Sequence, residues 1–214
     1  AVTEADVSNA AFPYYTAREI IIGVAHCLAL RVSYVGELGW EIYMPADLGL
    51  HVWDQLWEAG RPLGLIAAGT GAMDSLRIEK GYRRLGFDLD ANFTPFEAGM
   101  THVLRFQKGD FVGRDALLKL KDQPLARRLT CLTLDRAGDV VLGREPVFAE
   151  GRVAGVVSSA NTGYSVGRHI AYAYLPPGLS RAGQKLELEY FGERLPATVA
   201  AEPVFDPAGA RLRQ

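Results

Sequence analysis

The sequence predicts an α+β protein: an antiparallel-sheet α+β domain over residues 1–123, then a small all-β barrel domain over residues 124–214. Three observations support this. Apolar and polar residues alternate across residues 28–44, as in a strand–turn–strand hairpin. Helical spacing and helix-capping residues are concentrated between residues 47 and 121. From residue 128 onward only short strand patterns remain, separated by turn clusters, which favours a barrel or a sandwich.

The composition is that of an ordinary soluble globular protein and excludes two classes of function. A net charge of −2 lacks the concentrated positive charge that a nucleic-acid binder needs. No run of roughly 18 apolar residues exists, so we expect no membrane span. Cys27 and Cys131 lie in strand-like runs and form no Cys-x-x-Cys pair. We predict both to be small buried residues in a reducing compartment, the bacterial cytoplasm, although a disulfide between them stays open.

The hairpin has a register that the sequence leaves open. Its first strand is predicted over Leu28 to Tyr34 and its second over Trp40 to Met44, with two glycines in the reversal between them. If Tyr34 lies opposite Glu41, one face carries Leu30, Val32, Tyr34, Glu41 and Tyr43. A slip of one residue would send Glu41 to the other face.

Three helices are predicted after the hairpin. Asp47 is a suitable N-cap for the first, which ends at Gly60 and carries apolar residues at helical spacing, Leu50, Trp53, Leu56 and Trp57. We interpret its two tryptophans as core residues. The second helix spans about Gly71 to Lys80, and the third about Gly113 to Lys121. Thr94 and Glu97 form a capping box around Pro95, which predicts one more short helix.

Strand signals follow in the second part of the chain. They lie over residues 129–133, at Val153–Val157, at His169–Leu175, at Leu186/Leu188/Tyr190 and at Thr198–Val204.

Three motifs suggest chemistry that their context does not support. Residues 163–167 match the G-x-S-x-G pattern of a serine hydrolase, but a strand and not a helix is predicted after Ser165, so we expect a hairpin turn. Gly69-Thr70-Gly71 lacks the third glycine of a dinucleotide-binding loop, because Asp74 stands there. The four histidines show no metal-ligand spacing.

Three blocks together resemble the aminomethyltransferase family, which includes the glycine cleavage T-protein and the folate domains of sarcosine and dimethylglycine dehydrogenases. The blocks are Arg31–Tyr43 (RVSYVGELGWEIY), Ala72–Arg83 (AMDSLRIEKGYR) with Gly86–Asp90 and Thr94–Gly99, and Phe111–Leu117 (FVGRDAL). Gly183 and Pro203–Pro207 agree with the family's C-terminal barrel. The second block is most similar to the dehydrogenase branch. Asp110 stands where the iron–sulfur maintenance relatives have a cysteine.

The resemblance implies a tetrahydrofolate site. Glu41 matches the glutamate that binds the pterin ring, and a carboxylate can accept from the ring N3–H and the 2-amino group together. Tyr34 and Tyr82 match tyrosines of the folate pocket, with packing in the core as their alternative. The resemblance also favours the register that places Tyr34 opposite Glu41. Met73 replaces an arginine that contacts folate in the T-protein, a change that the dehydrogenase branch tolerates.

The resemblance further implies that the catalytic residue lies outside this sequence. The family's aspartate near the folate nitrogens comes from an N-terminal half, and Asp6 does not match it, so we expect no catalytic residue here. The expected partners are folate, a small amine-derived substrate, and either the missing half or a flavin dehydrogenase domain. FAD is implied only if a separate upstream domain exists.

The predicted function is therefore that of the C-terminal part of a tetrahydrofolate-dependent aminomethyltransferase-like protein. It would handle one-carbon units from amines such as glycine, sarcosine and dimethylglycine, and this part alone is expected to be inactive. The alternative is a non-catalytic module that uses the same fold for binding or protein interaction.

Overall fold

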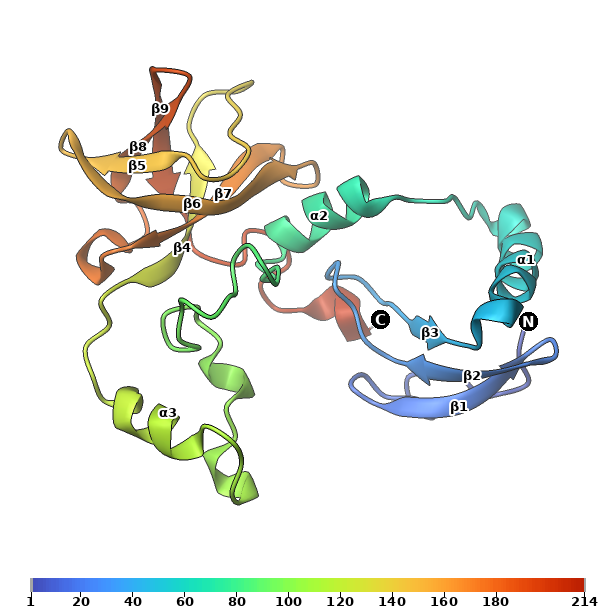
Figure 1. Cartoon of the computed structure of the whole chain (residues 1–214). Coiled ribbons are helices and arrows are strands. Elements are labelled where there is room, and N and C mark those ends of the chain that lie inside the picture. Colours follow the sequence, from blue (N-terminus) through green and yellow to red (C-terminus); the bar gives the residue numbers. More distant parts are fainter. Residues whose placement is uncertain (1, 214) are drawn as a thin grey trace. The chain divides into compact units, whose positions relative to one another are not determined.

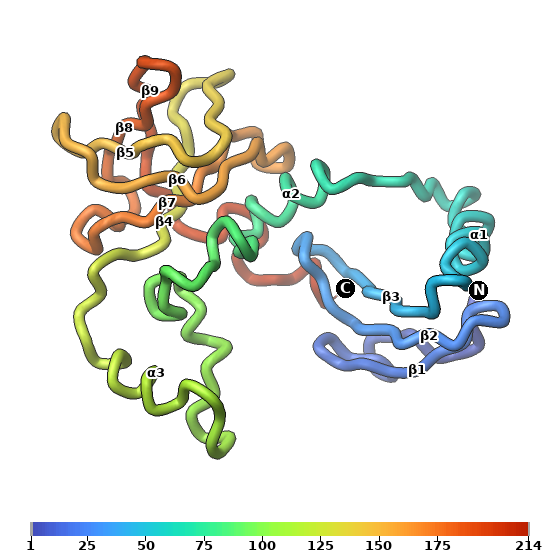
Figure 2. The backbone as a smooth tube through the Cα atoms, in the orientation of Figure 1, coloured from blue at the N-terminus to red at the C-terminus, as the bar shows by residue number. Residues whose placement is uncertain are grey.

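The computed structural model describes residues 2–213, which form two compact units. Unit 1 contains residues 2–77 together with residues 206–213, and unit 2 contains residues 78–205. Figures 1 and 2 show that the last segment of the chain, in red, returns to the unit that holds the first strands, in blue. Within the described residues, no helix is long and apolar enough to cross a membrane.

Unit 1 is built on a three-stranded antiparallel sheet in the order β1-β2-β3 (Figure 1). The strands are β1 (Ala17–Ile22), β2 (Ala25–Leu30) and β3 (Glu41–Tyr43). Because side chains alternate along a strand, one face of this sheet can be buried while the other stays open. The buried face packs against the N-terminal segment and helix α1 (Gly49–Gly60) through Phe12, Ile20, Ile22, Ala25, Cys27, Ala29 and Val52.

The hairpin exists, but the predicted register is wrong. Strand β2 ends at Leu30, and Glu41 lies opposite Leu30 rather than opposite Tyr34. Residues 31–40 form a ten-residue loop in which the Ser33 hydroxyl accepts hydrogen bonds from the N–H groups of Val35 (3.3 Å) and Glu37 (3.2 Å). These local bonds compete with strand pairing, so the loop opens well before the glycines. Tyr34 therefore lies in the loop and not in the ladder.

The first helix also differs from its prediction at two points. Asp47 is not its N-cap, because it lies inside the 3₁₀ turn η1 (Ala46–Leu48) and Leu48 occupies the N-cap position. The tryptophans are not core residues: Val52 is the buried residue of α1, whereas Trp53 is 52% exposed. Helical spacing identifies the apolar stripe but not what covers it. A further 3₁₀ turn, η2 (Arg61–Leu63), follows.

Helices α2 (Thr70–Glu79) and α3 (Arg114–Lys121) agree with the prediction. Gly81, with φ of 76°, follows α2 as a helix-ending glycine does. The short helix predicted at Thr94 is wrong. The reciprocal bonds of the capping box are present, from the Thr94 N–H to Glu97 Oε2 (2.8 Å) and from the Glu97 N–H to Thr94 Oγ1 (3.2 Å), but they close a turn. The 3₁₀ turns η3 (Thr101–Val103) and η4 (Phe106–Lys108) precede α3.

Unit 2 contains the predicted barrel, which is closed in the order β4-β7-β6-β5-β8-β9 (Figure 1). Its strands are β4 (Arg128–Leu134), β5 (Pro146–Ala149), β6 (Arg152–Gly163), β7 (Arg168–Leu175), β8 (Lys185–Tyr190) and β9 (Glu193–Val199). Short apolar side chains from all six strands, such as Val147, Val157 and Ala197, fill the interior, so it is a packed core and not a channel. The 3₁₀ turn η5 (Pro177–Leu179) lies between β7 and β8, and η6 (Ala210–Arg213) ends the described chain.

Two predictions about the barrel have clear outcomes. The strand expected over Thr198–Val204 is wrong at its end, because β9 stops at Val199. Pro203 follows within a few residues, and proline lacks the N–H that a ladder requires. The hairpin turn at the G-x-S-x-G motif is confirmed, since residues 164–167 are the turn between β6 and β7 and Ser165 is exposed on it.

Candidate functional site

Glu41 lies on the open face of the unit 1 sheet. The pairs Leu30–Glu41 and Leu28–Tyr43 face each other across β2 and β3, so all four side chains point to the same side. Ala29 and Cys27 alternate with the two leucines and are buried in the core on the opposite side. The sheet therefore presents Glu41 away from the core, next to apolar and aromatic side chains.

The Glu41 carboxylate is oriented by its neighbour on the strand. The Tyr43 hydroxyl donates a hydrogen bond of 2.7 Å to Glu41 Oε2, and this bond to the carboxylate raises the pKa of the tyrosine above its usual value. The other oxygen, Oε1, accepts no hydrogen bond from residues 2–213. A carboxylate has about four acceptor positions, so Glu41 can still accept from two adjacent N–H groups of a ligand. The edge of a pterin ring presents such a pair.

Tyr34 is held by the loop between β2 and β3. It is half-buried, and it follows Ser33, whose hydroxyl organises the loop. Further along the loop, Glu37 forms an ion pair of 2.8 Å with Arg211 of the C-terminal segment in the same unit. The structure thus places Tyr34 inside the loop of unit 1 that leads to Glu41, the first residue of β3.

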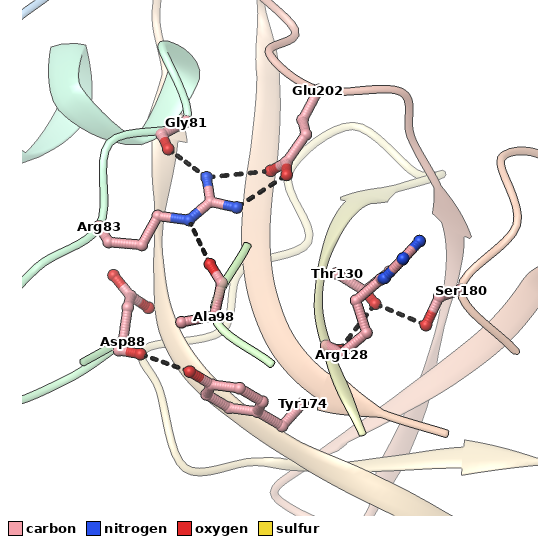
Figure 3. Close-up of polar contacts among 9 residues, drawn as sticks. All are labelled: Gly81, Arg83, Asp88, Ala98, Arg128, Thr130, Tyr174, Ser180 and Glu202. Carbon is pink, nitrogen blue, oxygen red and sulfur yellow. Dashed lines mark hydrogen bonds and ion pairs between the residues drawn. The ribbon is translucent and has the colours of Figure 1, made fainter. Parts of the chain in front are cut away.

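Tyr82 belongs to unit 2, where it follows Gly81 after α2 and is half-buried. Its neighbour Arg83 anchors this segment, as Figure 3 shows. The Arg83 guanidinium donates to both carboxylate oxygens of Glu202, at 2.7 and 3.2 Å, to the carbonyl oxygen of Ala98 at 3.2 Å, and to the carbonyl oxygen of Gly81. Burial by itself would lower the pKa of Arg83, but the Glu202 carboxylate raises it above the usual value. Sequence reasoning missed this ion pair, because its members are 119 residues apart.

Asp88 fixes the loop after Tyr82 to the barrel. Its buried carboxylate accepts hydrogen bonds from the hydroxyls of Ser158 and Ser159 on β6, and its backbone carbonyl accepts one of 2.7 Å from Tyr174 on β7 (Figure 3). Burial raises the pKa of Tyr174, so the hydroxyl stays a donor. The loop that carries Tyr82 is therefore fixed at two points, through Arg83 to the segment that follows β9 and through Asp88 to the barrel.

A small pocket of about 300 Å³ opens beside this ion pair. It is lined by Gly99, Thr101, Lys121 and Arg128, among others, and Glu202 forms part of its wall. Arg83 already neutralises Glu202, whereas Arg128 forms no ion pair within the described chain (Figure 3). The pocket therefore has net positive charge and can hold a carboxylate or another small anion. No sequence pattern pointed to it.

The remaining candidates give no metal centre. Within the part of the chain that the structure describes, no three His, Cys, Asp or Glu residues are grouped so that they could hold a metal ion. Cys27 and Cys131 are both free and buried, as predicted, and burial raises the pKa of the Cys131 thiol to about 12.

Met73, in α2, presents a partly exposed apolar side chain that cannot bind a carboxylate as an arginine would.

Two family models match the chain, and between them they cover most of it. The GCVT N-terminal domain matches residues 1–108, and the glycine cleavage T-protein C-terminal barrel domain matches residues 127–206. The chain belongs to the aminomethyltransferase family. These matches confirm the predicted resemblance and the α+β-plus-barrel architecture, while the domain boundary at residue 123 stays a prediction.

Relatives of the family include both aminomethyltransferases and dehydrogenases. Mouse mitochondrial dimethylglycine dehydrogenase is 35% identical over 216 residues, covering 100% of this chain and 25% of the relative. The aminomethyltransferase of Caldanaerobacter subterraneus is 35% identical over 198 residues, covering 92% of this chain and 52% of the relative. The crystal structure of aminomethyltransferase T of Bartonella henselae superposes with a TM-score of 0.78 at 26% identity, covering 85% of this chain and 50% of that one. The chain thus spans a quarter to a half of the length of these relatives.

Proposed function

We propose that this aminomethyltransferase-family chain binds tetrahydrofolate as the C-terminal part of a protein that handles one-carbon units from amines of the glycine, sarcosine and dimethylglycine type. The observation that supports this most directly is the Glu41 carboxylate. It lies on the open face of the sheet, one of its oxygens is oriented by Tyr43, and the other is available to a ligand.

The available acceptors fit the pterin edge. Two N–H donors on one edge of a flat ring match the two oxygens of a carboxylate, and such charge-assisted pairs are stronger than neutral ones. Leu28, Leu30 and Tyr43 offer apolar area on the same face of the sheet. When bound, tetrahydrofolate would supply the nitrogens that accept the one-carbon unit. We propose further that Tyr34, in the same unit as Glu41, contacts the ligand through its ring, whereas the role of Tyr82 stays a prediction.

In this proposal the chain positions the ligand rather than performing the proton transfers. Glu41 fixes the orientation of the ring, and the apolar residues beside it exclude water from one side. No residue of this chain is proposed as catalytic. We propose that the catalytic aspartate, and a flavin domain if the protein has one, belong to further polypeptide, so that residues 1–214 alone bind folate weakly and are inactive.

Calorimetric titration with tetrahydrofolate tests the proposal, using the complete gene product and the 214-residue chain in parallel. Glu41→Gln keeps the shape of the side chain but removes its charge. We expect a loss of affinity in the complete product of roughly ten- to a hundredfold, the value of a charge-assisted bond. The matched control is Glu193→Gln at the exposed start of β9, which should leave the affinity unchanged. Equal affinity of the wild type and Glu41→Gln would refute the folate site, and tight binding by the 214-residue chain would refute its expected weakness.

A non-catalytic interaction module is the second candidate, and one observation favours it. The segment between η2 and α2 is exposed along its whole length although it is strongly apolar. If the chain is such a module, Glu41→Gln changes neither folate affinity nor any interaction of that segment.

A further inference from the structure

An apolar stretch of the chain, Leu63–Ala68, is exposed in unit 1. Every residue from 61 to 70 is exposed, and among them Leu63 is 87% and Ile66 is 78% exposed. Apolar side chains that follow one another on the surface in this way are unusual unless another molecule or segment covers them. The stretch lies on the path from α1 to α2, as Figure 1 shows, so it is an internal segment and not a chain terminus.

The exposed stretch forms one wall of an apolar groove. The groove has a volume of about 590 Å³ and lies entirely within unit 1. Its other walls come from the N-terminal segment and from α1, where the rings of Trp53 and Trp57 stack at 5.8 Å with an angle of 10° between their planes. The side chains that line it are almost all apolar and include Val2, Val7, Trp53, Leu56, Trp57, Leu65 and Ile66. A molecule or segment that binds in this groove therefore has to be apolar, and no charged group is required for the contact.

The backbone of the stretch indicates what kind of occupant fits. The Leu65 N–H donates to the Gly60 carbonyl at 3.1 Å, and the Gly69 carbonyl accepts from the first turn of α2. Between these two points, residues 66–68 neither donate nor accept a backbone hydrogen bond within residues 2–213. Backbone N–H and C=O groups in a covered position require partners. A small apolar molecule would fill the groove but leave the backbone N–H and C=O groups of residues 66–68 without hydrogen bonds. An extended strand would fill the groove with its side chains and also form hydrogen bonds to these backbone groups.

We propose that residues 65–68 are a strand-addition site for an extended apolar segment of polypeptide from outside residues 1–214. Its alternate side chains would enter the groove beside Trp53, and its backbone would pair with residues 66–68. The solved aminomethyltransferase carries about as much chain again beyond the matched half, so relatives of this length have polypeptide available for the role. The inference does not depend on folate binding, since none of its residues belongs to the proposed ligand site.

Hydrogen–deuterium exchange with mass spectrometry tests the proposal on the complete gene product and on the 214-residue chain. In the complete product, the amides of residues 66–68 should exchange on the order of a hundredfold or more slowly than those of an exposed turn such as residues 137–138. In the 214-residue chain both sets should exchange rapidly. Rapid exchange of residues 66–68 in the complete product overturns the proposal. Slow exchange in the 214-residue chain, together with a dimer in light scattering, also overturns it, because a second copy is then the occupant.

Two variants check that the side chains contribute. Ile66→Asp places a charge in the groove and should restore rapid exchange of residues 66–68 in the complete product. Leu142→Asp is the matched control: Leu142 is 74% exposed in a loop of unit 2 and does not line the groove. Protection that survives Ile66→Asp would contradict the proposed contact. Because exchange is read at residues 66–68 and folate affinity at Glu41, either proposal can fail without the other.

Discussion

The ion pair between Arg83 and Glu202 predicts a specific loss of stability in unit 2. Glu202→Gln keeps the hydrogen-bonding shape of the side chain but removes the negative charge that faces the Arg83 guanidinium, whose side chain is only 10% exposed. A hydrogen bond to a charged group contributes about 1.5–3 kcal/mol. Because the Glu202 side chain is 34% exposed and Arg83 keeps its bonds to two carbonyl oxygens, we expect a loss of about 2 kcal/mol in the free energy of unfolding.

The assay can separate the two units. All three tryptophans, Trp40, Trp53 and Trp57, lie in unit 1, so tryptophan fluorescence reports on that unit, whereas far-ultraviolet circular dichroism follows the barrel strands as well. In urea, the dichroism transition of Glu202→Gln should shift to lower denaturant and the fluorescence transition should move much less.

A matched control exists on the same barrel. Glu189 pairs with Arg194 at 3.0 Å, but both side chains are 37% exposed, and exposed pairs contribute about 0–1 kcal/mol. Glu189→Gln should therefore have a smaller effect than Glu202→Gln. Equal losses in the two variants, or a loss below about 0.5 kcal/mol for Glu202→Gln, would refute the reasoning from burial.

Three further predictions follow from single contacts. Burial lowers the pKa of His169 below its usual 6.5, so on acidification the unfolded chain takes up a proton before the folded one does. The melting temperature of unit 2 should therefore fall as the pH drops through and below 6.5, and His169→Gln should weaken this pH dependence. Glu41→Gln should lower the pKa of the Tyr43 hydroxyl back toward 10. An ultraviolet titration measures this pKa when the curve of the Tyr43→Phe variant is subtracted, and a pKa equal to that of the wild type would contradict the hydrogen bond. Gly155→Ala should destabilise the barrel by about 1–3 kcal/mol in urea unfolding, because the added Cβ would overlap the carbonyl oxygen of Tyr174. A variant as stable as the wild type would contradict this, since the two strands would then be able to move apart at Gly155.

Much of the fold followed from local patterns in the sequence. The alternation around Glu41 and the helical spacing of α2 and α3 predicted elements that exist, because periodicity reports which face of an element is apolar. The capping box at Thr94 shows the limit of such signals. Its hydrogen bonds form as expected, but a turn and not a helix follows. Ala98 makes one i→i−4 bond to Thr94, and Gly99 then adopts a φ of 70°, which ends the helical path.

The candidate site was predicted in its residues but not in its geometry. Glu41 does lie on the open face of the sheet, yet its partner across the ladder is Leu30 and its hydrogen-bond donor is Tyr43. The tryptophans of α1 had the spacing of core residues, and Trp53 instead lines an exposed groove. Helical spacing cannot distinguish an apolar helix face that is buried from one that is exposed, because both have the same sequence pattern.

The sequence by itself determined most of the elements and, through its motifs, the family, because these depend on residues close together in the chain. The strand patterns alone left a barrel or a sandwich open, and the closed barrel is seen in the tertiary structure. Only the tertiary structure decided the register of the hairpin, where hydrogen bonds to Ser33 open a ten-residue loop, and the pairing of Arg83 with Glu202 across 119 positions. Such choices depend on the energies of competing long-range contacts, which no local pattern contains.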